Sequence, residues 1–71
     1  MSEQYEKTLE AITTFENYLQ GNKPENVAKA IWNLDYYLDN PKEFSEEESL
    51  KIDRGLARLA FRYIAKGLSK K

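Results

Sequence analysis

The sequence predicts an all-α fold, a small three-helix bundle with up-down-up topology. Apolar residues recur every three or four positions through most of the chain, which is the spacing of one helix face. Two short segments rich in turn-forming residues interrupt this periodicity, and no run alternates apolar and polar residues as a strand would. The helices are therefore expected at about residues 3–20, 24–39 and 46–68.

The first helix is expected to end just before Gly21, because glycine readily adopts the left-handed conformation that closes many helices. Its apolar residues fall on one stripe, which two further aromatic residues widen. The stripe contains Tyr5, Leu9, Ile12 and Leu19, with Phe15 and Tyr18 beside it.

The second helix is expected to begin near Pro24, whose fixed φ suits a first helical turn. Asn22 and Glu25 have the spacing of a capping pair at its N-terminus. Pro41 disfavours a helical conformation at Asn40, so the helix should stop there. The expected core stripe contains Val27, Ile31, Leu34 and Leu38, flanked by Ala30 and Tyr37.

The third helix begins with a capping box, in which Ser45 and Glu48 are expected to bond to each other's backbone N–H groups. Glu46 and Glu47 add negative charge at the positive end of the helix dipole. Gly67 and the lysines around it are typical of a helix C-terminus. The expected core stripe contains Ile52, Leu56, Leu59 and Tyr63, flanked by Ala60.

Composition narrows the class of protein. Seventy-one residues leave room for one domain, expected to span residues 1–71, and 41% apolar residues favour a folded chain over a disordered one. Cysteine and histidine are absent, which excludes disulfides, thiolate chemistry and the commonest general base. The sequence has neither a signal peptide nor an apolar run of membrane length, so a cytoplasmic protein without membrane contact is expected.

Catalysis is not expected from this sequence. The glutamates at 46–48 are explained by the helix cap, and Asp35 and Asp39 by an exposed pair one turn apart. The three glycines are scattered, so they do not form a phosphate-binding loop. We expect no catalytic residue, no cofactor and no metal site, and a bundle this small is expected to lack a ligand pocket of some hundreds of Å³.

The first candidate contact surface is the pair Trp32 and Tyr36. The two residues lie one turn apart and roughly 140–180° from the expected core stripe of the second helix. Tryptophan and tyrosine are enriched among the residues that anchor interfaces. Either the pair contacts a partner protein, or the loop at 41–44 folds back over it.

The third helix carries a second apolar stripe, roughly 120–180° from Ile52. Its members are Leu50, Ala57, Phe61, Ile64 and Leu68. We expect the helix to bury both stripes within the monomer, one against each neighbour; the alternative is a face for a homodimer or another protein. Gly55, in the middle of the helix, indicates either a close approach by a neighbouring helix or a surface position at which glycine has no structural role.

Charge is divided unevenly along the chain. Residues 54–71 carry six basic side chains and no acidic one, whereas residues 1–53 have a net charge of −7. Five of the basic residues recur at i+4 spacing, and we call them the basic row: Arg54, Arg58, Arg62, Lys66 and Lys70. The row has three candidate partners, namely nucleic-acid phosphates, an acidic protein, or this same chain, where Glu16 would come near one of the arginines. The acidic remainder, with a sequence pI near 5.4, disfavours nucleic acid.

Two functions from different classes follow from these surfaces. The first is a non-catalytic protein–protein interaction module, a small regulator or inhibitor, which is also a candidate homo-oligomer. The alternative is a nucleic-acid-binding accessory protein that uses the basic row. In size, acidity and helical architecture the chain resembles, in a general way, small phage- or mobile-element-encoded regulators and bacteriocin-immunity proteins, although no motif carries the resemblance. The residues expected to bind a partner are Trp32, Tyr36, Arg54, Arg58, Arg62 and Lys66.

Overall fold

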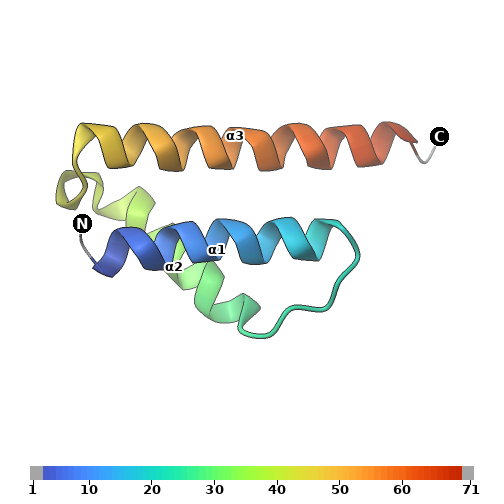
Figure 1. Ribbon diagram of the computed structural model, residues 1–71, viewed down its shortest axis with the longest axis horizontal. Helices are drawn as coiled ribbons and strands as arrows, with labels where there is room; N and C mark the ends of the chain where they lie inside the picture. The colour runs from blue at the N-terminus through green and yellow to red at the C-terminus, as the bar shows by residue number, and fades with distance from the viewer. Residues whose placement is uncertain (1–2, 70–71) are drawn as a thin grey trace.

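The computed structural model describes residues 3–69 and has the predicted three-helix architecture. The elements are α1 (Glu3–Leu19), α2 (Val27–Asp39), the short 3₁₀ helix η1 (Pro41–Glu43) and α3 (Glu46–Ser69). Helices α1 and α3 run in the same direction, and α2 returns obliquely across α1 (Figure 1). Helix α1 packs against both of the others, so it is the central element of the bundle. The sequence did not predict η1.

The ends of α1 and α3 follow the local signals in the sequence. Gly21, two residues after the end of α1, has a φ of +92°, the left-handed conformation predicted for this glycine. The capping box of α3 is also formed. The backbone N–H of Ser45 donates to Glu48 Oε1 at 2.9 Å, and the backbone N–H of Glu48 donates to Ser45 Oγ at 3.1 Å.

The predicted start of α2 is wrong by three residues. The helix begins at Val27, and its N-cap is Asn26, which makes no side-chain capping bond, so Asn22 and Glu25 do not cap it. Asn26 has a φ of +63°. A left-handed residue cannot continue a right-handed helix, and asparagine is one of the few non-glycine residues that adopt this conformation readily. The helix therefore starts only after it.

The core is a single cluster to which all three helices and the α2–α3 connection contribute. Its buried members are Tyr5, Ile12, Tyr37, Phe44, Ile52 and Leu59. Tyr37 and Phe44 meet edge to face, with ring centroids 4.9 Å apart. The hydroxyl of Tyr37 donates to Asp53 Oδ1 at 2.7 Å, which joins α2 to the first half of α3.

The contact between α1 and α2 is made by small and polar residues. Thr8, Ala11, Ala30 and Asn33 are all buried there. The side chain of Thr8 donates to the backbone carbonyl of Gln4 at 2.8 Å, and Gln4 Nε2 donates to Asn33 Oδ1 at 3.2 Å. These buried polar groups thus form hydrogen bonds, so burying them costs little free energy.

Several residues predicted to lie in the core stripes or beside them are exposed: Tyr18 at 56%, Ile31 at 47%, Leu38 at 64%, Tyr63 at 67% and also Ala60. The buried face of α2 centres on Ala30 and Tyr37, roughly 80° around the helix from the predicted stripe. The prediction that Tyr63 lies in the core is wrong for a different reason. Helix α2 approaches only the first half of α3 and diverges from the second half, to which Tyr63 belongs (Figure 1).

Candidate functional site

The aromatic pair on α2 is a stacked and partly tethered unit. The rings of Trp32 and Tyr36 lie 5.3 Å apart, with an angle of 26° between their planes. The hydroxyl of Tyr36 donates to Glu43 Oε1 in η1 at 2.6 Å. This hydrogen bond, together with desolvation and the negative charge of Glu43, raises the pKa of Tyr36.

The loop therefore contacts one member of the pair and leaves the other open. Tyr36 is half-buried, whereas Trp32 remains 59% exposed. Of the two predicted alternatives, the loop at 41–44 does fold back, but only over Tyr36. A large indole held against a fixed ring at the surface has the form of an interface anchor.

The basic row is divided between intramolecular contacts and solvent. Arg62 Nη1 lies 2.7 Å from Glu16 Oε1, which confirms the contact expected between Glu16 and one of the arginines. Lys66 Nζ donates to the backbone carbonyl of Leu19 at the end of α1. Arg54 and Arg58 are exposed, and neither forms an ion pair with any residue of the described part of the chain. Lys70 lies outside the described residues.

The two exposed arginines rim a shallow groove between α1 and α3, with a volume of about 500 Å³. Its lining residues are Leu9, Ile12, Thr13, Glu16, Lys51, Arg54, Gly55 and Arg58. A Cβ built on Gly55 would lie 3.0 Å from Ile12 Cδ1, so the glycine permits the close helix approach that the sequence indicated. No α2 residue lines the groove, so Arg54 and Arg58 lie on a different face from Trp32.

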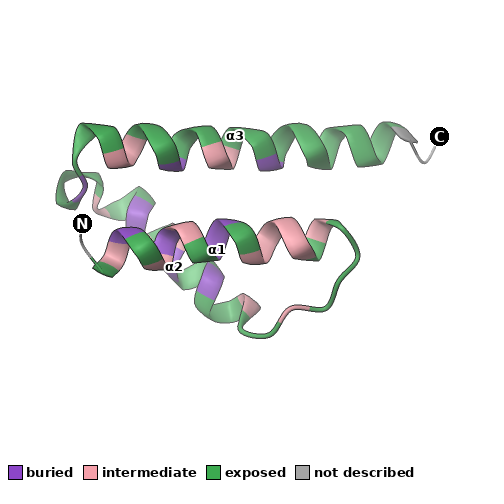
Figure 2. Cartoon of the chain, in the orientation of Figure 1, coloured by how far each residue is buried: buried purple, intermediate pink, exposed green. Residues whose placement is uncertain are grey.

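The second apolar stripe of α3 faces solvent, so the expectation that α3 buries both stripes within the monomer is wrong. Leu50, Phe61, Ile64 and Leu68 are each more than half exposed, and Ala57 is exposed as well. The buried and half-buried positions of α3 lie on the side that faces α1 (Figure 2). We call the five exposed residues Leu50, Ala57, Phe61, Ile64 and Leu68 the outer stripe.

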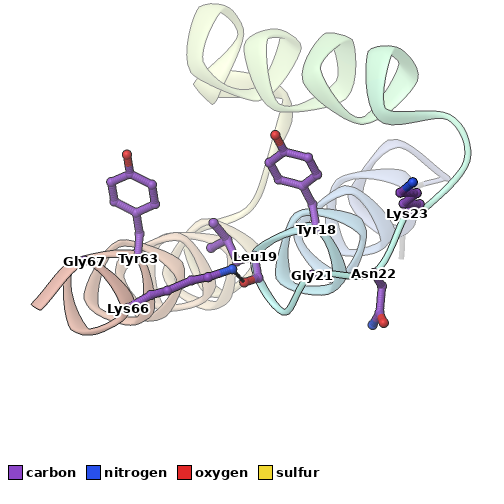
Figure 3. Close-up of a pocket in the computed structure, with 8 residues that line it drawn as sticks. All are labelled: Tyr18, Leu19, Gly21, Asn22, Lys23, Tyr63, Lys66 and Gly67. Carbon is purple, nitrogen blue, oxygen red and sulfur yellow. Dashed lines mark hydrogen bonds between the residues drawn. The ribbon is translucent and has the colours of Figure 1, made fainter. Parts of the chain in front are cut away.

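A further depression, of about 480 Å³, lies where the end of α1 meets the second half of α3. Tyr18 and Tyr63 stand on the same side of it, and Lys66 crosses between them to reach Leu19 (Figure 3). Both tyrosine rings are more than half exposed, so this is an open surface hollow. The sequence did not predict this hollow, because sequence patterns do not determine how helix ends splay.

The described residues do not assemble a metal site, since no group of three or more Asp, Glu, His or Cys side chains is placed to hold an ion in residues 3–69. Across the same range, no helix combines the length and the apolar character that crossing a membrane requires. Comparisons with models of protein families, with curated proteins and with solved structures give no match to this chain. Function is therefore inferred from the exposed surfaces just described.

Proposed function

We propose that this chain is a small, non-catalytic protein-binding module of the cytoplasm, a regulator or inhibitor that binds another protein through Trp32 and Tyr36. The observation that carries the proposal is the exposed, stacked indole of Trp32. Tryptophan and tyrosine dominate the residues whose truncation costs most in protein interfaces. A small fold has little spare apolar area, so leaving its one tryptophan outside the core needs a reason.

Pre-organisation strengthens this proposal. Tyr36 is held by Glu43, and Trp32 rests on Tyr36, so the indole has less rotamer freedom to lose when a partner binds. Side chains that are already ordered in the free protein avoid part of the entropy cost of association. The pair thus has both the chemistry and the rigidity of a binding anchor.

The test compares the wild-type chain with Trp32→Ala in affinity capture from the native host after nuclease treatment, followed by titration with the protein that is captured. We expect Trp32→Ala to weaken binding by about 2 kcal/mol or more while the helical circular dichroism and melting temperature stay nearly unchanged. Leu38→Ala is the matched control, because Leu38 is exposed on the same helix, roughly 120° from Trp32. Equal binding by both variants would refute the proposal, as would a large loss of stability in Trp32→Ala.

A second candidate is a nucleic-acid-binding accessory protein, supported by Arg54 and Arg58, which form no ion pair with any described residue; Lys51 lines the same groove but lies 3.7 Å from Glu47 Oε1. Arg62 and Lys66 already have partners within the chain, so fewer phosphates could be neutralised than the full row would allow. With about two phosphate contacts, the affinity should fall with salt with a log–log slope of about −2. Charge reversal of Arg54 and Arg58 should abolish binding; unchanged nucleic-acid retention would exclude this candidate.

A further inference from the structure

The outer stripe is a row of exposed apolar residues on the side of α3 opposite the core, with the charged Arg54 beside it between Leu50 and Ala57. At about 100° per residue, its five members fall within roughly 60° of one another and lie nearly opposite Ile52 and Leu59. None of the residues that the structure describes covers it, and the outward side of α3 is exposed along its length (Figure 2). This surface is separate from the Trp32 pair, which lies on α2.

The spacing of the outer stripe is that of a helix–helix seam. Leu50, Ala57 and Ile64 are seven residues apart, and so are Phe61 and Leu68. A repeat of seven residues keeps one face of a helix against another helix over several turns. Helix α3 has 24 residues and is therefore about 36 Å long, enough for such a seam. The occupant of the stripe should thus be a helix.

We infer that the occupant is α3 of a second copy of this chain, packed antiparallel in a two-fold symmetric dimer. A two-fold axis at Ala57 places Leu50 opposite the partner's Ile64 and Ile64 opposite the partner's Leu50. In such an interface, each contact occurs twice by symmetry. The small side chain of Ala57 at the centre lets the two helices approach closely, with larger side chains on both sides of it.

The distribution of charge along α3 favours an antiparallel orientation and a second copy as the occupant. The first eight residues of α3, 46–53, carry four acidic side chains and one lysine, a net charge of −3. The following residues to 68 carry Arg54, Arg58, Arg62 and Lys66 and no acid, and of these Arg62 and Lys66 contact α1, whereas Arg54 and Arg58 form no ion pair with any described residue. An antiparallel pair places the negative segment of each copy beside the positive segment of the other, and it also opposes the helix dipoles. A parallel pair would place like charges side by side.

The absence of cysteine from the sequence allows a direct test of both association and orientation. Sedimentation equilibrium of the full chain, from low micromolar to several hundred micromolar, should show reversible dimers. Ile64→Glu should raise the dimer dissociation constant by about 30-fold or more. Leu38→Glu is the matched control, because Leu38 on α2 is 64% exposed against 56% for Ile64, and it should not change the dissociation constant. Circular dichroism checks that each variant is folded.

Orientation follows from disulfide formation under mild oxidation. Ala57→Cys should form covalent dimers, whereas Ala28→Cys, an exposed alanine on α2, should not. A mixture of Leu50→Cys and Ile64→Cys chains should give mixed dimers, and Leu50→Cys alone should give none. A monomer at every concentration would overturn the inference, and so would Leu50→Cys homodimers or a dimer that Ile64→Glu leaves intact. Because Trp32→Ala should leave the dimer unchanged, this inference and the proposed partner site can fail independently.

Discussion

Substitution of Gly55 by alanine tests how closely α3 packs on α1. Two effects oppose each other in this variant. Alanine is favoured over glycine in a helix interior by about 1 kcal/mol. The added Cβ, however, would lie 3.0 Å from Cδ1 and 3.4 Å from Cγ2 of Ile12, a side chain that is only 9% exposed. Overpacking of this kind costs about 1–3 kcal/mol.

The nearest atom is the terminal methyl of a flexible side chain, so the cost should fall at the low end of that range. We therefore expect Gly55→Ala to be neutral or to destabilise the wild-type chain by up to about 1 kcal/mol. The sharper expectation concerns Ile12→Val, which removes Cδ1 and by itself costs about 0.5–1.5 kcal/mol. In that background the remaining contact is an ordinary one, so Gly55→Ala should stabilise by about 1 kcal/mol.

The assay is urea unfolding followed by far-UV circular dichroism for the wild-type chain, both single variants and the double variant. The two substitutions should show a coupling free energy of about 1–2 kcal/mol. Gly67→Ala is the control, because a Cβ there meets nothing within 4 Å, so it should show no coupling to Ile12→Val. If Gly55→Ala stabilised the chain equally in both Ile12 backgrounds, the close approach of α3 to α1 at Gly55 would be refuted.

Two further predictions concern the core. Burial and the hydrogen bond to Asp53 raise the pKa of Tyr37 above its ordinary 10.0, so the folded chain holds this proton at a pH where the unfolded chain has lost it. The stabilisation from this proton is complete below about pH 10 and is lost as the pH rises through the folded-state pKa. Tyr37→Phe should lower the free energy of unfolding by about 1 kcal/mol at neutral pH. In urea titrations at different pH values, the variant should also lose less stability than the wild-type chain as the pH rises. Ile52→Ala should lower the free energy of unfolding by about 2–5 kcal/mol, because Ile52 is 0% exposed. Ile31→Ala should lower it far less, because Ile31 is 47% exposed. Equal losses of stability for the two variants in melting experiments would contradict this difference in burial.

The elements that the sequence predicted correctly depend on contacts between near neighbours in the chain. Gly21 closes α1 through its own φ, and the capping box of α3 joins residues three apart. Such signals are complete within one helical turn, so they can be identified without knowing the fold. The predicted start of α2 was wrong because Asn26 adopts a left-handed conformation. Nothing in the sequence marks Asn26 as a stronger turn residue than Asn22.

The face of α2 could not be derived from apolar spacing alone. The stripe that includes Ile31 and Leu38 has the more hydrophobic residues, yet α1 packs on the face with Ala30 and Asn33. A close contact between two helices requires small side chains, and a buried Asn33 is acceptable only because Gln4 donates to it. Both conditions involve a second helix, so the pattern within α2 cannot reveal them.

The sequence predicted some of the candidate surfaces and missed others, again because the pattern within one helix does not show how a second helix packs against it. The exposure of Trp32 follows from its position opposite any plausible core face of α2, and Glu16 was expected beside an arginine because α1 and α3 were expected to run parallel. The groove rimmed by Arg54 and Arg58 and the hollow beside Tyr18 were missed. Their shapes depend on the distance and angle between helices, which the sequence pattern leaves undetermined.

The geometry of the bundle explains why α3 exposes so much apolar surface. Helix α3 has 24 residues, whereas α1 has 17 and α2 has 13, so α3 is about 10 Å longer than α1 and about 16 Å longer than α2. Because α2 diverges from it, α3 has one neighbour within the chain along most of its length, and that neighbour covers one stripe only. None of the described residues covers the other stripe, which is the surface that we propose a second copy buries.

This arrangement links the oligomeric state to stability. A chain of 71 residues has a thin stability margin, and association that buries the outer stripe adds to it by mass action. If α3 dimerises, the free energy of unfolding rises with protein concentration, and part of it belongs to the interface and not to the core. The Gly55 and Ile12 variants must therefore be compared at one concentration, below the dimer dissociation constant, because only there does their coupling report on packing between α1 and α3 alone.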